Sequence, residues 1–262
     1  MENPTPLRSL TERADHTRAR ILEAAIRQFG ENGLAGARTE QIAEAAGVNK
    51  ALLYYYFKSK EALYVAAIEA VAEGVQTASM AMLDADSSAG ERFLRIVLSN
   101  FDRTHAFPAF QGLMQQEMIR MHRGEANALQ LLAQKLVGPL WLRLRVLIEE
   151  GAAAGELIRA EWTQMIYSAL GANLFYYLSA PLIGPALEFN PLEPAALSFR
   201  RKSAIEYLGQ AIFVDREYGA RVAAQVLATT PMPEPADLSR HVNVRNCNIE
   251  APQTSATEAR HN

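Results

Sequence analysis

Residues 39–57 read TEQIAEAAGVNKALLYYYF, two short segments with helical apolar spacing on either side of a glycine. Gly47 ends the first segment, and Asn49, a residue type favoured at helix N-caps, opens the second. Two short helices joined by a tight turn that contains glycine have helix-turn-helix spacing. On a helical wheel Leu53 and Phe57 fall together, so both are expected to pack inward.

The opposite face of the second helix carries side chains that are unusual on a solvated surface. Ala51 and Tyr55 point away from the expected core, Leu52 and Tyr54 lie on the flanks, and Tyr56 adds a third phenol. Aromatic rings with polar tips suit an interface that is part apolar and part wet. In a DNA major groove, small residues allow close approach, apolar groups meet thymine methyls, and hydroxyls bond phosphates. This face therefore indicates DNA binding.

The net charge of the whole chain argues against DNA binding, whereas the net charge of its N-terminal segment favours it. The 262 residues carry a formal charge of -3, whereas DNA-binding domains usually have a basic excess. Residues 7–60, however, hold nine Lys and Arg against six Asp and Glu, a charge of +3, so the remainder totals -6. The basic surface is expected to be local. Four arginines could extend this surface as a basic N-terminal arm, namely Arg8, Arg13, Arg18 and Arg20. The alternative is that they belong to the solvated start of a helix.

Apolar residues recur three and four positions apart over most of the chain, so the fold is predicted to be all-α. Ser88 and Glu91 have capping-box spacing. Three further N-caps open helices whose free N–H groups can bond a phosphate, namely Thr39, Asn49 and Ser59. Helices are expected over about 17–31, 39–46, 50–57, 60–83, 91–107, 110–121, 126–150 with a kink at Gly138-Pro139, 162–180 and 195–228.

Several classes of protein and site receive no support. The single cysteine, Cys247, excludes an intrachain disulfide and a cysteine-based zinc site, and no metal site or cofactor is expected. Residues 1–10 lack the apolar core of a signal peptide, so a cytoplasmic protein is predicted. No catalytic motif is found. Residues 165–187 carry no charge, but interrupting glycines and prolines favour a buried helix at a dimer interface over a membrane span.

The N-terminal third resembles the TetR family of transcriptional regulators. The resemblance covers about residues 15–75 in register and is carried by Ile21-Leu22-Glu23-Ala24-Ala25, Phe29, Gly33, Thr39, Ile42-Ala43, Ala46-Gly47-Val48 and the run Leu53-Tyr54-Tyr55-Tyr56-Phe57-Lys58-Ser59-Lys60-Glu61-Ala62-Leu63. It implies a homodimeric, all-α repressor. A three-helix N-terminal domain would dock in the major groove of operator DNA, and a larger helical-bundle domain would dimerise and bind a small-molecule effector.

Carried over by position, the resemblance assigns DNA-contacting residues. Lys50 and its neighbours start the recognition helix, the tyrosines form its contact face, Lys60 clamps a phosphate, and Arg38 begins the preceding helix. Ala51 stands where glycine is frequent and Leu52 where a small hydroxyl residue is frequent, so apolar contact is expected there. The full set is Arg38, Thr39, Asn49, Lys50, Ala51, Leu52, Tyr54, Tyr55, Tyr56 and Lys60.

The predicted organisation is a flexible arm over 1–14, the helix-turn-helix domain over 15–75, a ligand-binding and dimerisation domain over 76–230, and a mobile polar tail over 231–262. The family plan places the dimer seam on the last two long helices. A methionine and aromatic stripe suggests a pliable pocket wall, with ordinary core as the alternative. The candidate pocket residues are Phe110, Met114, Met118, Met121, His122, Trp141, Trp162 and Phe175.

Together these patterns predict a DNA-binding regulator, a repressor released from a palindromic operator by a small apolar or aromatic effector. The alternative is a helical protein that binds a small molecule or a partner without binding an operator. Salt dependence separates the two, because phosphate contacts weaken steeply with salt. An enzyme is not expected.

Overall fold

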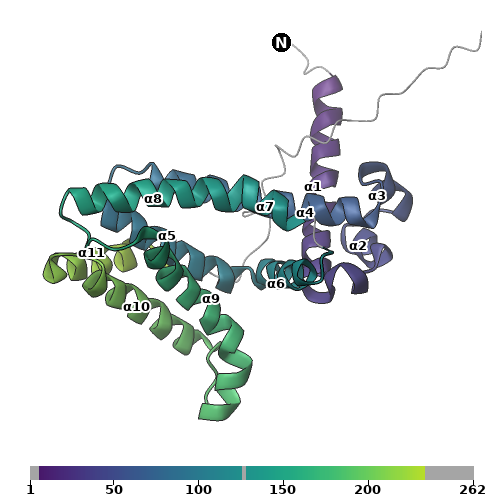
Figure 1. The fold of residues 1–262 in the computed structure, drawn as a ribbon. Coiled ribbons are helices and arrows are strands. Elements are labelled where there is room, and N and C mark those ends of the chain that lie inside the picture. The colour runs from purple at the N-terminus through teal and green to yellow at the C-terminus, as the bar shows by residue number, and fades with distance from the viewer. Residues whose placement is uncertain (1–5, 126–127, 234–262) are drawn as a thin grey trace, which may run out of the picture.

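The all-α prediction is confirmed by the computed structural model, which describes residues 6–125 and 128–233 (Figure 1). Within these ranges the only β-type pairing is an isolated bridge between Leu157 and Phe213. The elements are α1 (Pro6–Gly36), α2 (Thr39–Ala45), α3 (Lys50–Tyr56), α4 (Lys60–Leu83), α5 (Ala89–Ala106), α6 (Pro108–His122), α7 (Ala128–Leu132), the π-helical turn η1 (Ala133–Val137), α8 (Gly138–Ala153), α9 (Trp162–Leu187), α10 (Pro194–Ala211) and α11 (Arg216–Thr229).

The first helix is longer at its start than its apolar pattern predicts. It begins at Pro6 rather than near Thr17, and its N-terminal end projects from the rest of the molecule (Figure 1). Proline is tolerated there because the first turn of a helix needs no N–H donor. The predicted end near residue 31 agrees with a break at Gly33, which leaves helical geometry with φ 65° and ψ 177° before a short second helical segment runs to Gly36.

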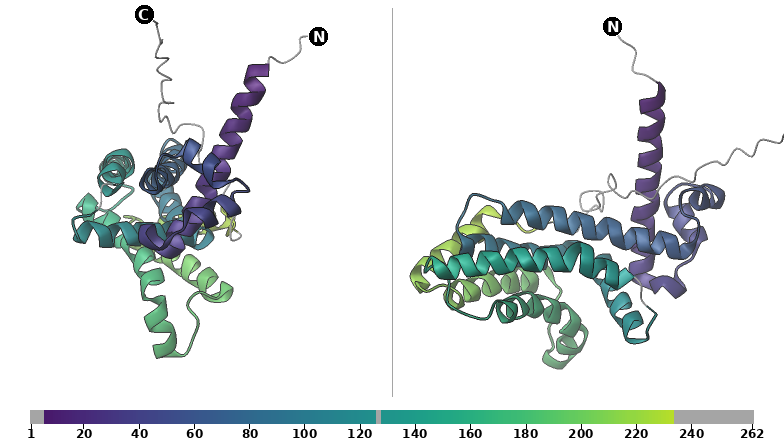
Figure 2. Two further views of the ribbon diagram at one scale, coloured as in Figure 1. Left: turned by 90° about the vertical axis from the view of Figure 1, so that its right-hand side faces the viewer. Right: turned by 45° about the horizontal axis from the view of Figure 1, so that its top comes forward.

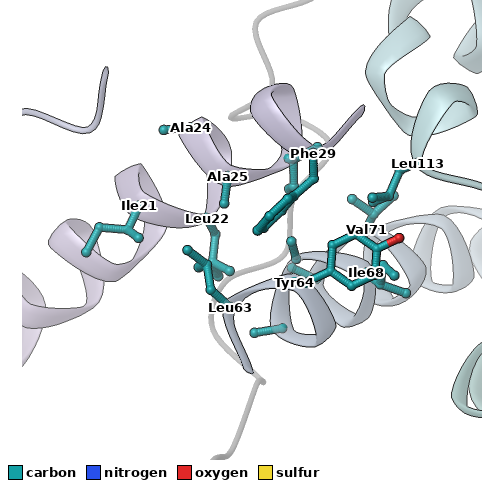
Figure 3. Close-up of a cluster of buried hydrophobic side chains, with 14 of the residues drawn as sticks. Ile21, Leu22, Ala24, Ala25, Phe29, Leu63, Tyr64, Ile68, Val71 and Leu113 are labelled. Carbon is teal, nitrogen blue, oxygen red and sulfur yellow. The ribbon is translucent and has the colours of Figure 1, made fainter. Parts of the chain in front are cut away.

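Helices α1 to α4 share a core with α6 and α7. Phe29 of α1 meets Tyr64 of α4 edge-on with ring centroids 5.0 Å apart, and Leu113 of α6 lies beside them (Figure 3). Leu132 of α7 belongs to the same cluster. The core around the helix-turn-helix therefore includes side chains that lie, in sequence, well after the predicted domain boundary at residue 75, because α6 packs along α1.

A second core joins α5, α8, α9, α10 and α11, and α4 connects it to the first. The N-terminal part of α4 contributes Leu63 to the first core, and its last residue, Leu83, belongs to the second. Figure 2 shows α4 and α8 running side by side along the length of the body. A single rigid helix therefore spans both halves of the molecule.

Three further predicted helices differ from their expected extents. The segment predicted as one helix over 195–228 divides, because the backbone of residues 212–214 pairs with that of 156–158 and Asp215 then caps α11. The predicted kink before Pro139 takes the form of η1 followed by α8, since a proline lacks the N–H that a continuous ladder needs. Helix α9 continues to Leu187 with Pro181 inside it, rather than ending near Ala180.

Three of the four predicted caps are confirmed. Asn49 accepts from the amide of Leu52, Ser59 from that of Ala62, and Ser88 from that of Glu91. The fourth is wrong: Arg38 is the N-cap of α2, and Thr39 is its first helical residue. Its hydroxyl instead lies 3.3 Å from that of Tyr54.

Candidate nucleic-acid interface and adjoining cavity

The turn between α2 and α3 is held by backbone geometry. Gly47 has φ +62°, a conformation that other residues rarely adopt, and its amide donates to the Glu44 carbonyl at 2.9 Å. The Asn49 side chain then accepts from the Leu52 amide at 2.7 Å, which starts α3. Leu53 and Phe57 are fully buried as predicted. The helix-turn-helix predicted from sequence is therefore present.

The three tyrosines of α3 have different environments. Tyr55 is 79% exposed, whereas Tyr54 is 37% exposed and places its hydroxyl against Thr39. Tyr56 is partly buried, packs against the first core, and meets the Tyr55 ring edge-on at 5.5 Å. Tyr55 is therefore the ring most available to a bound molecule, and exposed Ala51 lies one turn before it on the same face.

The first residue of α3 is paired across the turn. Lys50 donates to the carboxylate of Glu40 on α2, and its ammonium lies 5.9 Å from the centre of the Tyr54 ring. This hydrogen bond lowers the pKa of Glu40 and raises the pKa of Lys50. Both side chains are exposed, so a phosphate approaching Lys50 competes with Glu40.

Two other predicted cations flank α3. Arg38 is exposed and makes no side-chain capping bond. Lys60, at the start of α4, donates to the Ala35 carbonyl at 3.2 Å, so it also ties the end of α1 to α4. Of the N-terminal arginines, Arg18 stacks over the Phe57 ring at 5.4 Å, and Arg20 is exposed near the turn glycine. Basic side chains therefore lie on α1, just before α2, at the first residue of α3 and at the start of α4.

A cavity of about 440 Å³ lies beside α4, away from the helix-turn-helix. One wall is the C-terminal half of α4, another is α5, and residues 230–233 close a third side. Its apolar lining comes mainly from Val71, Val75, Ala78, Met82, Ala106 and Phe107. Its polar lining is Thr230 together with a stripe on α5 composed of Arg95, Ser99, Asp102 and Arg103.

Two charged residues of that stripe are bound by others. Arg201 of α10 donates to Asp102 at 2.7 and 2.8 Å and to the Thr230 carbonyl at 2.7 Å. Arg95 pairs with Glu91 at 2.7 Å and donates to the Thr230 hydroxyl at 3.1 Å. Burial raises the pKa of Asp102, although its hydrogen bonds with Arg201 oppose the shift. These bonds fasten the end of α11 beside the cavity.

Arg103 differs from Arg95 and Asp102 in having no charged partner among the residues described. Its guanidinium forms no ion pair with any residue in the described ranges, and burial lowers its pKa to about 10. Sequence reasoning missed this residue. Its helical spacing from Arg95 and Ser99 was visible, but that spacing is equally typical of a solvated helix face.

The predicted pocket residues are not brought together, and none lines this cavity. The buried face of α6 is set by Leu113 and Glu117, which turns Met118, Met121 and His122 outward. Trp141 and Trp162 pack against each other at 6.4 Å on the second core. The remaining residues are Met114, partly buried on the first core, Phe175, 68% exposed, and Phe110, whose side chain lies outside the described parts.

Among residues 6–125 and 128–233, no group of three or more His, Cys, Asp or Glu is placed to hold a metal ion. None of the helices described is long and apolar enough to cross a membrane.

Comparison with known proteins gives consistent matches. Residues 21–67 match the family described as bacterial regulatory proteins, tetR family. The HTH-type transcriptional repressor NicS of Pseudomonas putida is 34% identical over 147 residues, covering 55% of this chain and 67% of NicS. The HTH-type transcriptional regulator RutR of Escherichia coli is 55% identical over 51 residues, covering 20% of this chain and 24% of RutR. The chain thus spans about two thirds of one relative and a quarter of the other.

Solved structures share the fold. The ketosteroid transcriptional regulator KstR2 of Mycobacterium tuberculosis has a TM-score of 0.59 at 16% identity, over 76% of this chain and 95% of that one. A putative transcriptional regulator from Saccharomonospora viridis, in complex with choline, has a TM-score of 0.61 at 17% identity, over 76% of this chain and 98% of that one.

Proposed function

The chain belongs to the tetR family of bacterial regulatory proteins and is a DNA-binding transcriptional regulator, and from this premise we propose that it is a homodimeric repressor released by a small molecule. It would work in the cytoplasm, where bacterial DNA lies. The observation that carries the proposal is the outer face of α3, where Tyr55 is 79% exposed beside a basic rim.

For the DNA-reading site, α3 enters the major groove with Ala51, Leu52 and Tyr55 toward the base edges. Small and apolar side chains allow close approach and contact with thymine methyls, and the phenol can bond a base or a phosphate. Arg38, Lys50 and Lys60 lie around this face and contact the phosphate backbone. Thr39, Tyr54 and Tyr56 contribute mainly by fixing the position of α3, since their side chains are engaged within the domain.

For the dimer, an apolar surface on α9 and α10 supports pairing with a second copy. The C-terminal end of α9 projects beyond the body (Figure 1). A Cβ on Gly171, in the middle of α9, would meet nothing within 4 Å in the protomer, which leaves room for close approach of a partner helix. The exposed large apolar side chains on these helices are Tyr167, Leu174, Phe175, Leu178, Leu182, Leu187, Phe199 and Tyr207.

For release, the cavity beside α4 is the effector site. The same helix contributes Leu63 and Tyr64 to the core that holds α3, and Val71 and Val75 to the cavity wall. A ligand that shifts the C-terminal half of α4 therefore changes the position of the recognition helix. Because the two recognition helices of a dimer must enter grooves about one helical turn apart, a change in their separation lowers operator affinity.

The experiment is selection of bound fragments from random DNA, followed by anisotropy measurements on the selected site. The proposal expects a roughly palindromic sequence and an affinity that falls steeply with salt. A protein that selects no sequence and shows no salt dependence would instead be a helical ligand-binding or partner-binding protein without operator binding.

A further inference from the structure

We propose that the ligand of the cavity beside α4 is an apolar molecule with one carboxylate, and that Arg103 binds this carboxylate with help from the Ser99 hydroxyl. This inference rests on the proposed function for the place of the site, and it adds the chemical class of the effector. It adds a charged group to the predicted small apolar or aromatic effector.

The lining of the cavity divides into a polar wall and an apolar wall. Ser99 and Arg103 are one helical turn apart on α5 and both line the cavity. The wall from α4 offers aliphatic and thioether groups, including Val71, Val75 and Met82. A molecule that fits therefore has a polar end against α5 and an apolar body along α4.

The charges at the polar wall leave one positive charge unbalanced. Arg95, Arg103 and Asp102 line the wall, and two residues that do not line it pair with them, Glu91 with Arg95 and Arg201 with Asp102. Both oxygens of Asp102 accept from Arg201, so a cationic ligand finds no free acceptor on that carboxylate. One positive charge remains, on Arg103.

The unpaired charge of Arg103 is unfavourable where it lies. Arg103 is partly buried against the cavity, and a guanidinium that loses part of its water without gaining a counter-ion is destabilised, which is the physical reason that burial lowers the pKa of Arg103. A carboxylate matches the planar fork of a guanidinium with two parallel hydrogen bonds. A phosphate dianion would require a second free cation, but Arg95 is committed to Glu91. A single carboxylate is therefore the best complement.

The test is calorimetric titration of the full chain with two acids, octanoate and 4-phenylbutyrate, against their neutral amides. The wild type is expected to bind at least one acid about tenfold or more tightly than its amide. Arg103→Met should reduce binding of the acid to the level of the amide, and Arg103→Lys should retain part of the preference. Arg123→Met, the same charge change at an exposed position at the end of α6, should leave binding unchanged.

Thermal unfolding of the ligand-free variants shows whether Arg103→Met folds. Its midpoint should equal or exceed that of the wild type, because the substitution removes an unpaired, partly buried charge. Equal affinity for acid and amide, a preference that survives in Arg103→Met, or no binding of either acid at millimolar concentration would overturn the carboxylate assignment. These titrations contain no DNA, so an acid that binds without changing operator affinity contradicts the proposed release but not the assignment.

Discussion

Gly30 of α1 and Gly112 of α6 approach so closely that a Cβ on Gly112 would lie 2.4 Å from the Gly30 carbonyl oxygen. The reverse substitution is as crowded, since a Cβ on Gly30 would lie 2.4 Å from the Ala109 carbonyl oxygen. Helix α6 follows directly after Phe107, which lines the cavity, and α1 belongs to the core of the helix-turn-helix. This crossing is therefore a second connection, besides α4, between the cavity and the DNA-reading helix.

Gly112→Ala should force α1 and α6 apart, because both groups at the crossing are backbone atoms that cannot rotate away. We expect the free energy of unfolding to fall by about 1–3 kcal/mol in urea titrations. Operator affinity should fall as well. Gly36→Ala is the control, since its Cβ would meet only Asn32 Cβ at 3.4 Å, an ordinary contact. If both variants are equally stable, α1 and α6 can move apart enough to admit a Cβ without loss of stability.

Glu40→Gln should increase DNA affinity, because it releases Lys50 from its ion pair. Binding should strengthen on operator and random DNA alike, and the slope of log affinity against log salt should steepen by about 0.9 for one additional phosphate contact. Glu44→Gln is the matched control: it removes the same charge one turn later on α2 and frees no lysine. If both variants behave alike, Lys50 does not contact phosphate.

Tyr55→Ala should weaken operator binding by about 1–3 kcal/mol while leaving binding to random DNA nearly unchanged. Tyr54→Phe is the comparison variant: it removes only the hydroxyl that lies against Thr39 and helps to position α3, so it should cost less operator affinity than Tyr55→Ala. Anisotropy on the selected site and a scrambled duplex measures both. Loss of affinity in Tyr54→Phe but not in Tyr55→Ala would contradict the assignment of the contact face.

Lys60→Ala should weaken binding to all sequences alike, because a phosphate contact carries no sequence information. The substitution also removes the bond to the Ala35 carbonyl, so its thermal midpoint must be measured alongside. Lys202→Ala makes the same charge change on α10, in the second half of the molecule, and should leave DNA affinity unchanged. If Lys60→Ala lowers affinity for some DNA sequences more than for others, Lys60 is not a simple phosphate contact.

Arg201→Met should destabilise the fold by about 3–5 kcal/mol, because it leaves the buried Asp102 carboxylate unpaired. The double variant Asp102→Asn with Arg201→Met should recover much of the loss. Burial already raises the pKa of Asp102, and without Arg201 it should rise further. A raised pKa in the folded state costs stability as pH rises through it, so the deficit should shrink as pH is lowered. A deficit independent of pH would contradict this account.

Leu178→Glu on α9 should convert a dimer into a monomer, because it places a charge on the proposed seam. Leu142→Glu is the control, since Leu142 is also exposed, at 60%, but lies on α8. Light scattering over a range of concentrations measures both. A dimer that survives Leu178→Glu and is lost in Leu142→Glu would move the interface to α8.

The helix-turn-helix could be predicted because its signals are local. A cap at Asn49, a turn glycine at position 47 and the wheel positions of Leu53 and Phe57 all act within one or two helical turns. Helix extents were predicted less well where distant segments intervened. The break before Asp215 depends on backbone pairing with residues 156–158, which no periodicity near position 213 records.

The sequence by itself determined the fold class, the family and the face of α3 that points outward, because periodicity and capping follow from neighbouring residues. Only the tertiary structure decided which charges remain available. Lys50 is paired with Glu40, Lys60 holds Ala35, and Arg201 reaches Asp102 from a position 99 residues away, whereas Arg103 is left without a partner among the residues described. The cavity is likewise decided by the tertiary structure. Its walls come from α4, α5 and the residues that follow α11, and the packing of these segments against one another sets its position.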